Sequence, residues 1–183
     1  MCSKLKNNYG DACYLINDGS CRFRTDDIGY SITSPWTVDK RDPSGKIIVW
    51  RDIEELSNGM LGFEFIADIP EPKDGTCFKI SDSAGKSLMN LEISDGSYLF
   101  NGVKTNFPAQ SGTVFVKIKA DLDKHTAMLF IDGKKASSEY SLPDVYASRV
   151  SFSFFQTDEN KFAVHRCDVY KDYAINEIFL VPE

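Results

Sequence analysis

Three kinds of segment are missing from this sequence, and each absence narrows the class of protein. No apolar run approaches the about 18 residues that a membrane-spanning helix needs. No run of Lys and Arg occurs, and 21 basic against 27 acidic side chains give a net charge of −6. Nucleic-acid binding depends on clustered cations, so we expect no nucleic-acid partner and no membrane insertion. The opening MCSKLKNNYGD also lacks the apolar middle of a signal peptide.

The cysteines lack the spacing of a structural metal site. None of the five forms a CxxC pair, so a structural zinc site is not expected. An odd number leaves at least one thiol outside any disulfide within the chain. Cys13 and Cys21 flank an Asn-Asp-Gly turn and are either partners across a hairpin or free core thiols. Cysteine usage therefore does not decide the compartment.

A long segment with helical period is also missing, whereas alternation of apolar and polar residues recurs along the chain. One short candidate for a helical turn is RDIEELSNG, residues 51–59, where Ile53 and Leu56 are three positions apart. We predict an all-β chain, an antiparallel β-sandwich of the jelly-roll kind, as a single domain over residues 1–183. The expected strands are 12–16, 21–24, 30–33, 47–51, 60–68, 77–81, 88–93, 97–100, 112–121, 126–132, 149–155, 163–170 and 174–181.

The stretch DLDKHTAMLFIDGKK, residues 121–135, concentrates three aspartates and a histidine. A strand of about 6 residues spans roughly 20 Å. Asp132 is therefore predicted at the opposite end of a hairpin from Asp123, and the cluster is interpreted as two turns. The alternative is a calcium ion held by Asp121 or Asp123 together with another loop, because carboxylates are its usual ligands.

The same region resembles a known superfamily. The segments VKIKADLD, TAMLFIDGKK and INEIFLV are similar to the strand, turn and final strand of the concanavalin A-like lectin/glucanase jelly rolls, especially laminin-G-like and polysaccharide-lyase-associated members. Residues 60–68 and 88–96 fit the same pattern more loosely. The resemblance covers roughly residues 45–183 and implies the fold. It does not specify a function, since this fold carries lectins, hydrolases, lyases and adhesion modules.

The catalytic motifs of enzymes with that fold are absent. Glycoside hydrolysis needs two converging carboxylates, and the nearest approximation, Glu64-Phe65-Ile66-Ala67-Asp68, has Ile where the middle acid should be. The Q-x-H and Y-x-K-x-G-x-Y strands of jelly-roll alginate lyases do not occur. Arg166, Asp168 and Tyr170 are expected to share one face of a strand. That face is either a polar binding surface, with His165 beside it, or a solvated sheet.

Carbohydrate binding remains the leading hypothesis, because sugar sites combine aromatic rings with polar side chains. We expect a non-catalytic accessory module of a larger extracellular or cell-surface polysaccharide-degrading protein. Any cofactor that it binds is expected to be calcium. The alternatives are a jelly-roll polysaccharide lyase or glycoside hydrolase, and a structural or protein-interaction module. Trp50 is either a binding residue or core, and Tyr140 and Tyr146 are further aromatic candidates. The main candidate residues for sugar binding are Trp36, Tyr30, Trp50, Arg51, Tyr98, Arg166, Asp168 and Tyr170.

Overall fold

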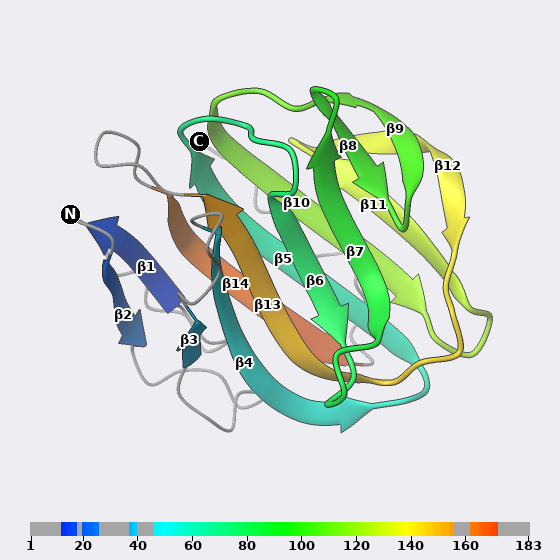
Figure 1. Cartoon of the computed structure of the whole chain (residues 1–183). Helices are drawn as coiled ribbons and strands as arrows, with labels where there is room; N and C mark the ends of the chain where they lie inside the picture. The colour runs from blue at the N-terminus through cyan, green and yellow to red at the C-terminus, as the bar shows by residue number, and fades with distance from the viewer. Residues whose placement is uncertain (1–11, 18–19, 26–36, 40–45, 156–161, 172–183) are drawn as a thin grey trace.

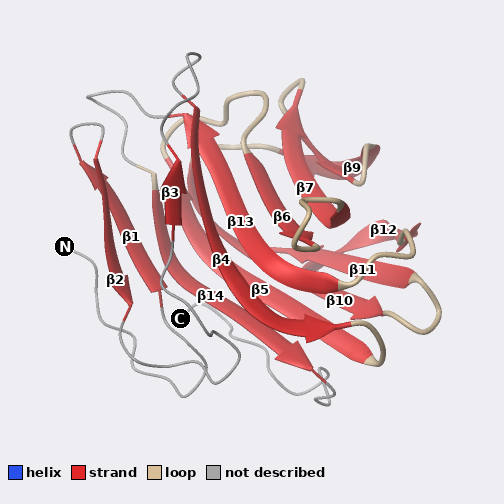
Figure 2. Cartoon of the chain, turned by 60° about the horizontal axis from the view of Figure 1, so that its bottom comes forward, coloured by secondary structure: helices blue, strands red, loops and turns tan. Residues whose placement is uncertain are grey.

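The computed structural model describes residues 12–17, 20–25, 37–39, 46–155 and 162–171. These residues form two seven-stranded sheets packed face to face (Figures 1 and 2). Every pairing between neighbouring strands is antiparallel. The described part contains only strands and turns, so it has no helix of the length and apolarity that crossing a membrane requires. The predicted antiparallel β-sandwich is confirmed.

The two sheets have different strand orders. Sheet 1 runs β12-β11-β10-β5-β14-β1-β2, and sheet 2 runs β3-β4-β13-β6-β7-β8-β9. Consecutive strands from β4 to β14 run alternately toward the two ends of the sandwich, so every second loop lies at the same end. The strands are β1 Ala12–Asn17, β2 Ser20–Thr25, β3 Thr37–Asp39, β4 Lys46–Leu56, β5 Met60–Ile69, β6 Cys77–Ser81, β7 Ser87–Ser94, β8 Ser97–Phe100, β9 Val103–Pro108, β10 Gly112–Asp121, β11 Thr126–Ile131, β12 Lys134–Ser141, β13 Ala147–Phe155 and β14 Ala163–Lys171.

The core lies between the sheets and is rich in phenylalanine. Phe65 of β5 is fully buried, with its ring centroid 4.5 Å from that of Phe78 on β6 and 5.6 Å from that of Phe152 on β13. Phe154 stacks on Phe162 with centroids 4.3 Å apart. The alternation of apolar residues along each strand supplies these rings, since every second side chain points to the same face.

The expected helical turn at residues 51–59 is wrong, because β4 continues as a strand to Leu56. A bulge explains the misleading spacing: the five residues of β4 from Asp52 to Leu56 lie opposite only three residues of β13, from Arg149 to Ala147. The irregularity allows Ile53 and Leu56, three positions apart, both to be buried. Their helix-like spacing is a property of a bulged strand.

Three strands were not predicted: β3, β9 and β12. All three lie at the edge of a sheet. In β12 only Ala136 and Tyr140 are buried, and the other side chains are exposed. Edge strands commonly carry polar and charged residues, which discourage pairing with other molecules, so their apolar alternation is weak. The predicted strands at 30–33 and 174–181 lie outside the described residues.

The hairpin of β1 and β2 corrects one pairing. Cys13 lies opposite Arg24, and Cys21 lies opposite Ile16. The two cysteines are therefore not cross-strand partners, as one of the sequence interpretations required. The side chains of this hairpin lie outside the described part of the structure.

Candidate functional site

The structure separates the candidate residues that the sequence had grouped. Along β4 the side chains alternate, so Trp50 is half-buried on the outer face of sheet 2 while Arg51 points inward and is 8% exposed. Tyr98 is 2% exposed and belongs to the core, and Tyr140 is 5% exposed. These two tyrosines have no ring face free for stacking on a sugar. Tyr30 and Trp36 lie outside the described residues.

On β14 the side chains of Arg166, Asp168 and Tyr170 lie outside the described part of the structure, whereas Val164, Cys167 and Val169 are buried. A bulge lies between Val164 and Arg166. The register places Asp168 opposite Glu64 of β5, and Glu64 in turn lies opposite Lys117 of β10. In backbone register these residues form a row across three strands of sheet 1, and the shared face expected for Arg166, Asp168 and Tyr170 stays a prediction. Whether its members bind a ligand stays a prediction.

The described part of that row is buried. The Lys117 Nζ lies 2.6 Å from a Glu64 carboxylate oxygen, and each side chain is 1% exposed. Lys119 is 7% exposed on the same face, with its ammonium 5.5 Å from the Phe130 ring centroid. The outer face of sheet 1 is therefore buried at these positions of β5 and β10, while the two interpretations of the Arg166, Asp168 and Tyr170 face stay predictions.

The hairpin of β10 and β11 confirms the two-turn interpretation of residues 121–135. Asp121 lies opposite Thr126, whereas Asp132 follows the last residue of β11 at the other end. Asp121 accepts hydrogen bonds from the Lys124 amide at 3.0 Å and its ammonium at 2.7 Å, and the side-chain bond lowers the pKa of Asp121. No group of three His, Cys, Asp or Glu side chains suited to a metal forms among the described residues. Calcium at this turn stays a prediction.

A cavity of about 230 Å³ opens at the end of the sandwich where the loops β4–β5, β6–β7, β10–β11 and β12–β13 meet. This end lies at the lower right of Figure 1. We refer to it as the loop-end pocket. Each of the four loops contributes side chains, so residues far apart in the sequence meet there. Its lining is Ser57, Asp82, Lys86, Leu88, Leu122, His125, Asp144, Val145 and Tyr146.

Backbone hydrogen bonds join three of the four loops, namely β4–β5, β10–β11 and β12–β13. The Leu142 amide donates to the His125 carbonyl at 2.8 Å, and the Leu122 amide donates to the Gly59 carbonyl at 2.9 Å. His125 has a φ of 54°, a conformation that turns the chain sharply between the two strands. The pocket wall is therefore built by contacts between loops, and its shape is set before any ligand enters.

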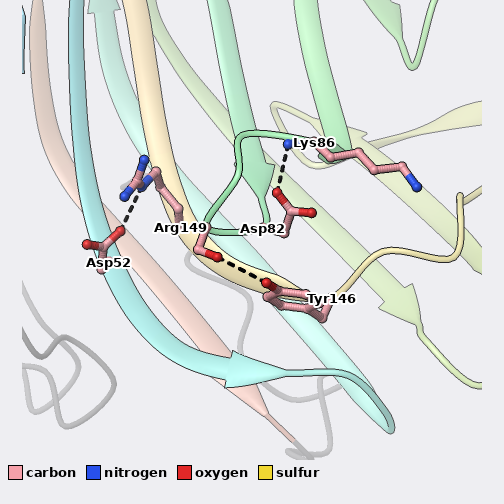
Figure 3. Close-up of polar contacts among 6 residues, drawn as sticks. Asp52, Asp82, Lys86, Tyr146 and Arg149 are labelled. Carbon is pink, nitrogen blue, oxygen red and sulfur yellow. Dashed lines mark hydrogen bonds and ion pairs between the residues drawn. The ribbon is translucent and has the colours of Figure 1, made fainter.

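The β6–β7 loop carries the polar side of the pocket. Asp82 is 9% exposed and accepts a hydrogen bond from the Lys86 amide at 2.8 Å. The Ser83 hydroxyl lies 3.0 Å from the Tyr146 hydroxyl, which joins this loop to the β12–β13 loop (Figure 3). The side chains of Lys86 and Asp144 are exposed. The pocket thus offers both donors and acceptors above an apolar floor of Leu88 and Leu122.

A second cluster lies beside the pocket, on the outer face of sheet 2. The Arg149 Nε donates to a carboxylate oxygen of Asp52 at 2.7 Å, and its guanidinium carbon lies 5.7 Å from the Trp50 ring centroid. Figure 3 shows the Asp52–Arg149 pair on the same side of the molecule as Tyr146. We refer to Trp50, Asp52 and Arg149 as the sheet cluster.

The thiol of Cys77 lies on this same outer face, where its Sγ is 2.6 Å from the Asn90 side-chain oxygen. Burial raises the pKa of Cys77 from 9.0 to about 11, against the opposing influence of Lys46. Two pKa units mean about 100-fold less thiolate at pH 8, and the thiolate is the reactive form. We expect iodoacetamide to modify Cys77 about 100-fold more slowly in the folded chain than in urea, as measured by peptide mass spectrometry.

The same pKa shift of Cys77 determines how the stability of the folded chain changes with pH. The unfolded thiol loses its proton near pH 9, whereas the folded thiol keeps it to about pH 11. The contribution of the protonated Cys77 thiol to the free energy of unfolding is therefore complete below pH 9 and is lost as the pH rises toward 11. Equal labelling rates in the folded and unfolded chain at pH 8 would contradict the burial of this thiol.

No protein-family model matches the sequence, and no curated protein matches it either. Among solved structures, a sialidase shares the fold with a TM-score of 0.58, 15% identity and coverage of 75% of this chain and 15% of the sialidase. The binding domain of botulinum neurotoxin serotype D/C gives a TM-score of 0.54, 11% identity and coverage of 88% and 48%. The carbohydrate-binding module CBM66 of Bacillus subtilis gives a TM-score of 0.52 and 11% identity, with coverage of 77% of this chain and 94% of the module.

The first of these structures are much longer than this chain, which spans 15% of the sialidase and about half of the toxin structures. At such low identity the likeness establishes architecture, since one fold hosts many functions. The narrower likeness to laminin-G-like members stays a prediction. The chain has the jelly-roll sandwich fold that these structures share, and this fold agrees with the resemblance to the concanavalin A-like lectins and glucanases.

Proposed function

We propose that this chain is a carbohydrate-binding module whose loop-end pocket receives one sugar ring. The observation that carries the proposal is the composition of that pocket, where carboxylates, an ammonium and hydroxyls surround an apolar floor. Sugar rings present CH faces and hydroxyls, so a site for them needs both apolar and hydrogen-bonding surface. At about 230 Å³ the pocket is smaller than the roughly 300–1,000 Å³ of typical sites for larger ligands, which suits one ring.

The comparisons support this proposal by precedent. A carbohydrate-binding module, a galectin and botulinum neurotoxin type C, whose cell entry depends on interaction with two ganglioside molecules, share the fold of this chain. We further propose, as expected from the sequence, an accessory role within a longer extracellular protein. Recognition would be passive: Asp144 accepts hydrogen bonds from sugar hydroxyls, while Lys86 donates to sugar oxygens.

The test is an array of plant, microbial and animal glycans probed with the full chain, followed by calorimetry on the glycans that bind. We expect Asp144→Ala to weaken binding about tenfold or more, because a hydrogen bond to a charged group contributes roughly 1.5–3 kcal/mol. Tyr146→Ala should weaken it as well, since the ring lines the pocket and its hydroxyl positions the β6–β7 loop.

Asp74→Ala is the matched control. Asp74 is also an exposed loop aspartate, but it lies between β5 and β6, at the opposite end of the sandwich. Its replacement should leave binding unchanged. The proposal is contradicted if no glycan binds, or if the Asp144 and Asp74 variants bind a ligand equally well.

A further inference from the structure

The sheet cluster and the loop-end pocket are neighbours along one strand. We propose that they are two subsites for one ligand, the end of an uncharged oligosaccharide chain, with its terminal ring in the pocket and a later ring on Trp50 and Arg149. This inference rests on the proposed function, which it deepens by naming the ligand class. Three features of the structure support it: the contacts that hold the Arg149 side chain in place, the distance between the subsites, and the charges of their side chains.

Arg149 is held in place before any ligand arrives. Asp52 binds its Nε at 2.7 Å, and Trp50 packs against the guanidinium at 5.7 Å. The side chain of Arg149 is nevertheless 28% exposed and that of Asp52 50% exposed. A planar guanidinium fixed on two sides keeps its remaining N–H donors aimed outward, so little rotamer entropy is lost when they bind hydroxyls. The half-buried Trp50 beside it supplies apolar surface.

The separation of the two subsites suits a chain and not a single ring. Tyr146 lines the pocket and immediately precedes β13, while Arg149 is the third residue of that strand. A strand rises about 3.3 Å per residue, so the two backbone positions lie roughly 10 Å apart. Figure 3 shows the turn after β6 lying between the Asp52–Arg149 pair and Tyr146. A ligand that reaches from the pocket to the sheet cluster passes over this turn.

The charges of the combined surface favour an uncharged ligand. Asp82 and Asp144 in the pocket and Asp52 in the sheet cluster oppose Lys86 and Arg149. Three carboxylates against two cations create no field that would attract a polyanion. Hydroxyl groups, in contrast, pair with both kinds of side chain. Neutral sugar chains therefore fit this surface better than uronate or sulfated chains.

The same two strands carry a matched control. Phe155 of β13 lies opposite Lys46 of β4, with the ammonium 5.8 Å from the ring centroid. This pair repeats the aromatic–cation arrangement of Trp50 and Arg149 on the same face of sheet 2. It lies six residues farther along β13, roughly 20 Å from Arg149 and away from the pocket. Loss of Phe155 removes a comparable ring without touching the proposed path.

The experiment measures binding of gluco-, manno-, xylo- and fructo-oligosaccharides of one to six units, with oligogalacturonate as the charged probe. For the series that binds, we expect affinity to rise roughly tenfold from the single sugar to the longer chains. Trp50→Ala and Arg149→Lys should remove this rise and leave single-sugar binding unchanged. Phe155→Ala should retain it, and oligogalacturonate should bind more weakly than the neutral chain.

The possible failures are distinguishable. Absence of binding by every probe overturns the two-subsite inference, and absence of binding to every glycan of the array overturns the proposed function as well. Binding that is independent of chain length, or single-sugar binding that falls equally in Trp50→Ala, overturns the inference and leaves the pocket as a one-ring site. Preferred binding of oligogalacturonate overturns the neutral ligand class. Circular dichroism of each variant establishes its folding, and Arg149→Lys tests the subsite while retaining the charge.

Discussion

Replacement of Lys117 by methionine is expected to lower the free energy of unfolding by about 3–5 kcal/mol. The substitution leaves the carboxylate of Glu64 buried without the ammonium that lies 2.6 Å from it. Removal of one partner of a buried ion pair is strongly destabilising for this reason. Urea denaturation followed by tryptophan fluorescence measures the difference.

A double variant isolates the interaction between Glu64 and Lys117 from the contacts that each makes with other residues. Replacement of a buried ion pair by apolar side chains of similar size is often close to neutral, because no charge remains to be desolvated. Glu64→Leu combined with Lys117→Met should therefore be less destabilised than the sum of the two single variants. Lys134→Met, at an exposed position of β12, should change stability by less than about 0.5 kcal/mol. Additive losses in the double variant would show that the two charges do not depend on each other.

Phe65→Ala should cost about 3–5 kcal/mol of the free energy of unfolding. The ring is fully buried and contacts rings from both sheets, with Phe63 at 5.3 Å on its own strand and Phe78 at 4.5 Å across the sandwich. Truncation loses its transfer free energy and leaves a cavity between the sheets. Chemical denaturation measures the loss, provided that the variant retains a folded baseline.

Two further variants make that measurement interpretable. Phe65→Leu fills most of the space and should cost only about 1–1.5 kcal/mol, so it stays measurable if the alanine variant does not fold. Phe130→Ala removes a half-buried ring from the outer face of sheet 1 and should cost less than Phe65→Ala. Equal losses for Phe65 and Phe130 would contradict the assignment of the core to the space between the sheets.

The interior strands could be predicted from the sequence because their alternation records burial on one face. The expected bounds of β6, β8 and β10 agree with the structure residue for residue. Val150, Phe152 and Phe154 are each 1% exposed, as their spacing along β13 predicted. Where a strand lies at a sheet edge or contains a bulge, as in β9 and β4, the periodic signal weakens or changes spacing.

The candidate site could not be predicted in the same way. Consecutive strands alternate in direction, so a count along the chain that leaves out β9 assigns β10 the opposite direction. The loop after β10, which carries His125, is then placed at the wrong end of the sandwich. The correct count brings His125 beside Tyr146 and Lys86. None of these residues forms a local motif, and Tyr146 was only one of several aromatic candidates. Their proximity arises from four loops that end at the same edge.

The sequence by itself determined the class of fold, because a two-residue period can bury a continuous apolar face only by placing one sheet against another. It also determined that the aspartates of residues 121–135 divide between two turns. Only the tertiary structure decided which face each candidate occupies: Trp50 points outward, while Arg51 beside it is buried. It also decided which loops meet, since strand order and register are set by packing between segments far apart in the chain. The pocket and the sheet cluster follow from that packing.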